Sequence, residues 1–172
     1  MKKSIVLICS VLVINLLSVG CSSVDGESSC SQDLTGALST TEADFVGTWT
    51  LTGLISEIEV DLTDDNMSNP STEVFSQLPE CQKDVVYIFN SDRTFAIQQA
   101  YNVEGCPNKA LVEGTWKLSG GQLTLVALCS SPRYNIILNS EFTLFTLEDT
   151  YNFNDQTGVI INSDVILTYE KI

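Results

Sequence analysis

The stretch that decides the fold is DVVYIFN-SDR-TFAIQQAY, residues 84–101. Two runs rich in β-branched and aromatic residues flank the polar segment Ser91-Asp92-Arg93, a pattern typical of a β-hairpin. Pairing the runs across this turn predicts three cross-strand pairs: Phe89 with Phe95, Tyr87 with Ile97, and Val85 with Gln99.

Further hairpins follow in the chain. Residues 111–119 and 122–129 flank Gly120-Gly121, a two-residue loop that accepts positive φ at both positions, so Leu118 should pair with Leu123 and Trp116 with Leu125. Residues 133–139 and 142–153 predict a third hairpin, in which either Phe142 and Leu144 or Thr143 and Phe145 face inward. The last strand, 159–172, carries Val165, Leu167 and Tyr169 on one side.

The first strand, residues 46–61, changes its buried face part-way along. Trp49 and Leu51 share one face, whereas Ile58, Val60 and Leu62 have the other parity, so we expect a β-bulge near Gly53-Leu54. Thr40 or Thr41, with Asp44 as the acid, should cap a short helical turn that ends at Phe45.

The predicted strands number about eight, and their connections alternate between tight turns and longer loops. In an up-and-down antiparallel sheet, this alternation puts all tight turns at one end and all long loops at the other. The pattern predicts an all-β fold, an antiparallel barrel with a closed end and a mouth. Four aromatic residues should fill the closed end: Trp49, Phe89, Phe95 and Trp116. Six residues in the mouth half form the candidate ligand pocket: Tyr87, Ile97, Gln99, Tyr101, Tyr134 and Ile136.

The N-terminus predicts export. Lys2 and Lys3 precede an apolar run that ends in Ser18-Val19-Gly20-Cys21. A small residue directly before a cysteine resembles the lipobox of bacterial lipoproteins, although Ser18 stands where leucine is usual. This resemblance implies a signal peptide at 1–20, acylation (palmitate or a similar chain) at Cys21, a flexible tether at 21–44 and a barrel domain at 45–172. A plain signal peptide or a single membrane helix is the alternative, although the apolar run is short for a membrane span.

Composition excludes several function classes. The chain has 172 residues and a net charge of −14, which becomes −16 without the two lysines of residues 1–20. We expect no binding to nucleic acid, because both partners would be negative. The chain has no histidine and no C-x-x-C motif, which argues against the commonest zinc, thiol-redox and hydrolase sites. We therefore expect no catalytic residue, no cofactor and no metal site; the acids Glu57, Glu59, Asp61, Asp64 and Asp65 should form a solvated face.

Four cysteines remain in the expected mature domain, which favours disulfides in an oxidising compartment. Cys81 precedes the second strand and Cys106 follows the third, so both lie at the mouth of one hairpin and should pair. Cys129, which ends the fifth strand at the mouth, then has Cys30 as its remaining partner. That bond requires the residues before Phe45 to run along the barrel wall, and the sequence leaves its formation open.

Gly47-Thr48-Trp49 looks like the G-x-W signature of lipocalins. The ordered set of Cys81–Phe95, then Cys106, then Gly114-Thr115-Trp116-Lys117-Leu118 is similar to lipocalin-like lipoproteins of Bacteroidota. The resemblance covers about residues 45–172, with one departure at Arg93, where this family usually has a turn glycine. It implies the fold and a lipid-anchored place in the cell envelope, with the outer membrane expected.

Two functions follow as expectations. The first is non-covalent binding of a small apolar or amphipathic ligand in the mouth half. The alternative is a protein-interaction role, with an envelope protein as partner, loops 62–83 and 102–110 as the contact surface, and a filled barrel. An enclosed volume of about 300 Å³ or more at the mouth separates the two.

Overall fold

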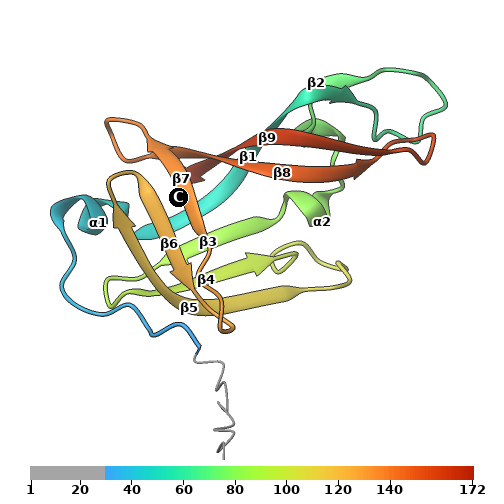
Figure 1. The fold of residues 1–172 in the computed structure, drawn as a ribbon. Helices are drawn as coiled ribbons and strands as arrows, with labels where there is room; N and C mark the ends of the chain where they lie inside the picture. Colours follow the sequence, from blue (N-terminus) through green and yellow to red (C-terminus); the bar gives the residue numbers. More distant parts are fainter. Residues whose placement is uncertain (1–29) are drawn as a thin grey trace, which may run out of the picture.

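The computed structural model describes residues 30–172; the expected signal peptide and Cys21 lie outside this range. Nine strands form one antiparallel sheet, and pairing of β1 with β9 closes eight of them into a barrel (Figure 1). The predicted antiparallel barrel of about eight strands is thus confirmed. No helix within residues 30–172 is both long and apolar enough to cross a membrane.

The barrel strands follow in chain order around the sheet. They are β1 (Gly47–Val60), β3 (Val85–Phe89), β4 (Thr94–Gln99), β5 (Ala110–Ser119), β6 (Gln122–Val126), β7 (Arg133–Leu138), β8 (Leu144–Asn154) and β9 (Ile160–Lys171). The remaining elements are helix α1 (Thr40–Phe45), strand β2 (Ser71–Glu73), the 3₁₀ helix η1 (Phe75–Gln77) and helix α2 (Glu80–Lys83). Strand β2 pairs with the outer part of β1 and stays outside the barrel wall.

The connections separate the two ends of the barrel. Short turns at 90–93, 120–121 and 139–143 define the closed end, over which α1 lies. Longer connections at 61–84, 100–109, 127–132 and 155–159 define the mouth. The alternation of loop lengths therefore predicted both ends correctly.

The predicted registers of the first two hairpins are confirmed. Tyr87 pairs with Ile97 and Phe89 with Phe95, and the second hairpin has both of its predicted pairs, Trp116–Leu125 and Leu118–Leu123. Gly120 and Gly121 have φ of 58° and 78°, the left-handed conformation that a two-residue hairpin loop requires.

The third hairpin takes one of its two possible registers. Leu138 pairs with Phe145 and Ile136 with Leu147, so Phe145 and Leu147 face the core. The side chain of Asn139 fixes this turn, since its Oδ1 accepts hydrogen bonds from the N–H groups of Thr143 and Leu144 at 2.9 and 3.0 Å. A side-chain contact of this kind decides between registers that apolar alternation leaves equal.

Strand β1 has the predicted bulge. Its pairing with β9 shifts register between Leu51 and Gly53, and both Leu51 and Leu54 are buried. The extra residue moves the buried face from odd to even positions. Trp49 and Leu51 therefore pack in the same core as Leu54 and Val60.

Helix α1 ends at Phe45 as expected, but its cap differs from the prediction. Ser39, not Thr40 or Thr41, is the N-cap, and Glu42, not Asp44, completes the capping box. The Ser39 N–H donates to Glu42 Oε2 at 2.8 Å, and the Glu42 N–H donates to Ser39 Oγ at 3.3 Å. Glu42 rather than Asp44 completes the capping box because its carboxylate also bonds the buried Arg93 side chain, described below.

Candidate functional site

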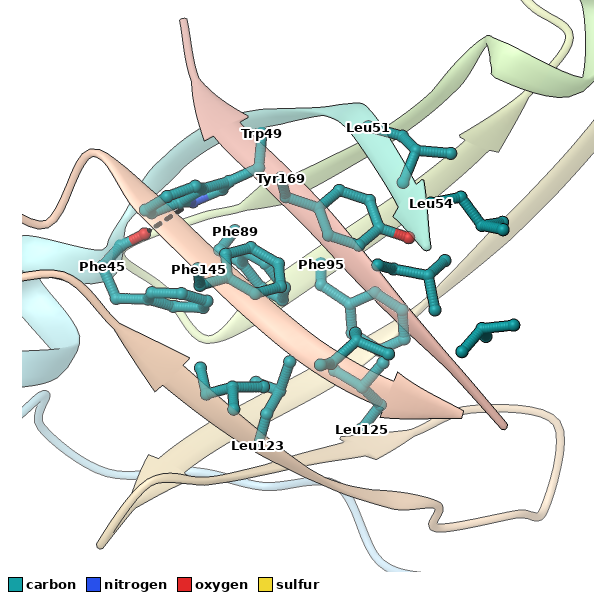
Figure 2. Close-up of a cluster of buried hydrophobic side chains, with 14 of the residues drawn as sticks. Phe45, Trp49, Leu51, Leu54, Phe89, Phe95, Leu123, Leu125, Phe145 and Tyr169 are labelled. Atoms are coloured by element: carbon teal, nitrogen blue, oxygen red, sulfur yellow. Dashed lines mark hydrogen bonds between the residues drawn. The ribbon is translucent and has the colours of Figure 1, made fainter. Parts of the chain in front are cut away.

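The closed end is packed solid around Phe45. Its ring centroid lies 4.7 Å from that of Phe89, 5.0 Å from Trp49 and 5.5 Å from Phe145. The Trp49 indole also donates a hydrogen bond to the Phe45 carbonyl at 3.0 Å (Figure 2). The predicted aromatic filling of this end is confirmed, because Trp49, Phe89, Phe95 and Trp116 are all buried in one cluster.

A buried ion pair stabilises the aromatic cluster of the closed end, which is named here the plug. Arg93 donates to both Glu42 oxygens, at 2.7 and 2.9 Å, and only 5% and 3% of the two side chains are exposed. The other guanidinium donors bond the carbonyls of Gly36, Ala37 and Trp116. The bonded Arg93 guanidinium lowers the Glu42 pKa to about 2 against the opposing effect of burial.

The structure explains why Arg93 stands where the resembling family usually has a turn glycine. Its φ is 71°, so the expected left-handed turn is present without glycine. The strain of this conformation is offset by the complete bonding of a buried guanidinium. The non-glycine residue at a glycine position was the sequence signal, but its partner Glu42 is 51 residues away and had no signal of its own.

Residues 30–38, named here the strap, run along the outside of the barrel from the mouth to the closed end (Figure 1). The strap begins at the Cys30–Cys129 disulfide, whose Cα atoms are 4.2 Å apart. Its middle bonds strand β5, where the Leu34 N–H donates to Thr115 Oγ1 at 2.8 Å. The predicted tether of 21–44 is therefore attached to the barrel from residue 30 onward, along the wall that the Cys30–Cys129 bond requires.

The Cys81–Cys106 disulfide holds the rim of the mouth. Cys81 and Cys106 join the 61–84 and 100–109 loops at a Cα separation of 5.6 Å, as predicted. Beside it, the Asp84 carboxylate accepts hydrogen bonds from the N–H groups of Asn102 and Val103 at 2.6 and 3.0 Å. These bonds connect the two longest mouth loops into one rim.

One pocket opens on the inner wall of the mouth half, with a volume of about 210 Å³. Its lining comes from β4, β5, β6, β7 and the connection between β6 and β7: Phe95, Ile97, Val112, Leu125, Ala127, Leu128, Ser130, Pro132 and Tyr134. The lining is mainly apolar, with Tyr134 and Ser130 as its polar side chains. Its volume is below the roughly 300 Å³ that we set to separate ligand binding from a filled barrel, so the pocket does not meet that criterion and has room only for a small ligand or one end of a longer ligand.

The six predicted pocket residues divide into two groups. Ile97 and Tyr134 line the pocket, Tyr87 faces inward nearby, and Ile136 is buried in the core. Gln99 and Tyr101 are exposed and lie outside the pocket. The chain turns at the buried Ala100, which has a φ of 60°, and this turn sends Tyr101 into the rim under Lys109.

Sequence reasoning did not assign three residues of β8 and β9 to the mouth half, although it had placed Tyr169 on one side of the last strand with Val165 and Leu167. They are Asp149, Tyr151 and Tyr169, on β8 and β9. Their alternation with Leu147, Phe153 and Leu167 was a usable signal, but the open register of the third hairpin hid it. Figure 2 shows the Tyr169 ring beside Phe145, with its hydroxyl pointing away from Trp49 and Phe45.

The tyrosines of this region titrate abnormally. Burial raises the pKa of Tyr87 and Tyr169, the neighbouring tyrosines raise it further, and the Asp149 charge adds a smaller effect in the same direction. Burial and Asp149 also raise the pKa of Tyr134 and Tyr151. All four phenols are therefore neutral hydrogen-bond donors at physiological pH.

A larger hollow of about 540 Å³ lies on the outer face of β1, β9 and β8. Its lining includes Ile55, Ile166 and the hydrogen-bonded Thr150 and Asp164, together with Asp149 and the buried Ser56 and Val165. Seven of its nine lining residues are exposed. This hollow is therefore a surface groove and not part of the barrel cavity.

The acidic patch is only partly the solvated face that we expected. Glu57 and Glu59 are exposed, but Asp61 is 6% exposed and accepts hydrogen bonds from the N–H groups of Thr63 and Asn69. The Gln156 side chain also donates to Asp61, which joins the 61–84 and 155–159 connections. Within residues 30–172, no group of three or more metal-binding side chains is found.

The sequence comparison places this barrel in a family. A family model described as a domain of unknown function (DUF5004) matches residues 23–171. The chain belongs to the DUF5004 family. The match spans the strap and every strand, so the DUF5004 domain includes residues that we had expected to be only tether. No curated protein matches the chain.

Proposed function

We propose that this DUF5004 protein is an exported, lipid-anchored barrel that binds a small amphipathic ligand non-covalently in its mouth half. The observation that carries the proposal is the pocket beside Tyr134, open at the mouth of a barrel whose other end is sealed by Phe45. An apolar inner wall with few polar groups is typical of small-molecule sites. We propose no catalytic step, in keeping with the absence of histidine.

Filling the pocket tests this proposal. Val112 faces the pocket on β5, whereas its neighbour Leu111 points outward and is exposed. We expect Val112→Trp to weaken binding of the neutral apolar probe N-phenyl-1-naphthylamine by at least about tenfold, because the indole occupies the probe's volume. Leu111→Trp is the matched control and should leave binding unchanged.

The test includes a folding control and an outcome that would contradict the proposal. Both variants should retain the cooperative thermal unfolding of the parent, which shows that the barrel has folded. Equal probe binding by the parent and Val112→Trp would exclude the pocket as the binding site. No probe binding by the parent would favour the filled-barrel alternative.

The anchor is a separate part of the proposal. The lipobox-like Ser18-Val19-Gly20-Cys21 supports acylation at Cys21, and two disulfides support an oxidising compartment. The resemblance to lipocalin-like lipoproteins of Bacteroidota supports the cell envelope, most simply the outer membrane, on its periplasmic or surface side. Cys21→Ala should give an unprocessed or soluble form; membrane association with unchanged mass would refute the anchor.

A protein-interaction role is the second candidate. The observation that favours it is the rigid rim, in which the Cys81–Cys106 disulfide and the Asp84 carboxylate join loops 62–83 and 102–110. Such a rim presents a preformed surface to an envelope protein partner. Covalent cross-linking from a photoreactive residue at Glu104, compared with one at Lys117 on the outer wall, distinguishes this role from ligand binding alone.

A further inference from the structure

The connection between β6 and β7 contains a strained turn at residues 127–130, named here the Leu128 turn. The Ala127 N–H donates to the Ser130 carbonyl at 3.1 Å, and the Ser130 N–H donates to the Ala127 carbonyl at 2.8 Å. Between them, Leu128 and Cys129 have φ of 50° and 60°, the left-handed conformation that a two-residue turn of this kind requires. Asparagine and glycine are the usual residues at such positions, so the turn holds its leucine at a cost in backbone energy.

This turn presents a large apolar side chain to solvent. Leu128 is 84% exposed, the highest exposed fraction among the large apolar side chains of residues 30–172. Together with Ala127 and Ser130, it also borders the β4–β7 pocket. A single exposed leucine is ordinary on a protein surface, but one that is held by a strained turn at the edge of a pocket indicates a contact surface.

The Leu128 turn is also the place where the strap is joined to the barrel. Cys129 forms the disulfide with Cys30, so the strap begins beside the connection between β6 and β7 (Figure 1). Cys21, the proposed acylation site, stands nine positions before Cys30. Since an extended chain spans at most about 3.6 Å per residue, the disulfide keeps Cys21 within roughly 32 Å of the turn. A lipid anchor at Cys21 therefore holds the Leu128 turn near the membrane.

The distribution of charge favours the same approach. Residues 21–172 have a net charge of −16, yet residues 114–140, which include most of the β5–β7 wall and the Leu128 turn, contain no acid and two cations, Lys117 and Arg133. A membrane surface that contains anionic lipids repels acidic side chains and attracts basic ones within about one Debye length. Repulsion is therefore weakest where this wall approaches the membrane.

We propose that the Leu128 turn docks on the bilayer that carries the lipid anchor, with the Leu128 side chain inserted into the apolar layer and the Cys30–Cys129 bond holding it there. Docking brings the β4–β7 pocket, which Leu128 borders, to the membrane surface. This inference rests on the proposed lipid anchor and adds to it the surface of the barrel that contacts the membrane.

Quenching of tryptophan fluorescence by brominated lipid measures the insertion. Trp49 and Trp116 are fully buried in the plug, so a tryptophan added on the surface gives a separate signal. The full-length chain with Leu128→Trp, purified from membranes, is reconstituted in phosphatidylcholine vesicles with or without dibrominated acyl chains. We expect the brominated lipid to remove at least about half of the added fluorescence, because the indole lies among the acyl chains.

A tryptophan at the closed end is the matched control. Ile172 is 81% exposed, and its N–H bonds the Thr48 carbonyl next to the start of β1, far from the mouth. Ile172→Trp therefore adds an equally exposed indole at the opposite end. Brominated lipid should remove less than about a tenth of its fluorescence, because bromine quenches only at short range and this end faces away from the bilayer.

Two disulfide variants test the role of the tether. Replacing Cys30 and Cys129 by serine in the Leu128→Trp chain releases the strap from the turn and should reduce the quenching at least about twofold, because the anchor no longer holds the turn at a high local concentration of lipid. Replacing Cys81 and Cys106 instead is the matched control, which removes the rim disulfide and should leave the quenching unchanged. Thermal unfolding shows whether each variant is folded, and the comparison with Ile172→Trp needs neither of them.

Flotation with the vesicles separates this inference from the proposal on which it rests. A chain that does not float has no lipid anchor, which would overturn both. Equal quenching of Leu128→Trp and Ile172→Trp in a chain that floats would overturn the docking surface and leave the anchor intact. Unchanged quenching after loss of the Cys30–Cys129 bond would overturn the assigned role of that disulfide.

Discussion

At the closed end of the barrel a buried charged pair is fully bonded, whereas on the pocket wall of the mouth half a tyrosine hydroxyl has no hydrogen-bond partner found within residues 30–172. Arg93 and Glu42 are buried and bonded to each other and to backbone. Tyr134 is partly exposed and lines the pocket. The comparison shows that the closed end is the more completely bonded part of the barrel, and the proposed ligand site lies in the other part.

The comparison predicts the largest loss of stability at the closed end. Arg93→Met leaves the Glu42 carboxylate buried without its cation, which should lower the free energy of unfolding by about 3–5 kcal/mol. Urea unfolding measures this change. The matched control is Lys83→Met, which breaks the exposed ion pair with Glu80 and should cost less than about 1 kcal/mol. Equal losses in the two variants would show that the Arg93 pair does not fasten the plug.

The rim disulfide should have the next largest effect. Replacing Cys81 and Cys106 by serine opens a loop of 25 residues, and the chain-entropy model gives a loss of about 3 kcal/mol. Non-reducing peptide mapping of the parent checks the pairing first; a Cys106–Cys129 peptide would contradict both assigned disulfides. Thermal unfolding of the double variant then measures the loss.

The pH dependence should differ between the two ends. Because Arg93 lowers the Glu42 pKa from 4.5 to about 2, the closed end contributes stability above pH 4.5 that is lost as the pH falls towards 2. The tyrosine pKa values are raised, so the mouth contributes stability below pH 10 that is lost as the pH rises above it.

Urea unfolding across this pH range in the parent and in Arg93→Met separates the two contributions. The variant should lose much of the acid dependence, because it lacks the guanidinium that lowers the Glu42 pKa. Its alkaline dependence should match the parent, because the mouth tyrosines are unchanged. An unchanged acid dependence would refute the assignment of that dependence to Glu42.

Features that depend on residues close in sequence could be predicted, whereas those that depend on contacts between distant residues could not. Local patterns predicted the barrel, the registers of two hairpins and the bulge at Gly53. Alternation and loop length are properties of neighbouring residues, so the sequence displays them directly. The strap was predicted only as a condition of the Cys30–Cys129 bond, and the Glu42–Arg93 pair joins residues 51 positions apart, of which only Arg93 had a sequence signal.

The candidate site was predicted in part for the same reason. Ile97 and Tyr134 were placed on the pocket wall and Tyr87 on the inner face because alternation holds within their strands. Gln99, the last residue of β4, and Tyr101, which follows the turn at Ala100, are exposed and lie outside the pocket, because alternation was applied up to and past the end of the strand. Period-two reasoning therefore fails at the mouth, where strands end.

The smallest effects are expected when one hydroxyl oxygen is removed at each end of the barrel. At the closed end, Ser39→Ala removes the N-cap of α1 and should cost about 1 kcal/mol, because the Glu42 N–H loses its acceptor. At the mouth, Tyr134→Phe should change stability by less than about 0.5 kcal/mol, because no hydrogen bond from the Tyr134 hydroxyl is found within residues 30–172 and the ring keeps its packing. Urea unfolding of both variants measures the difference, and probe binding of Tyr134→Phe adds a second readout. A loss at Tyr134 equal to that at Ser39 would mean that the mouth is bonded as completely as the plug, and its polar groups would then not be free for a ligand.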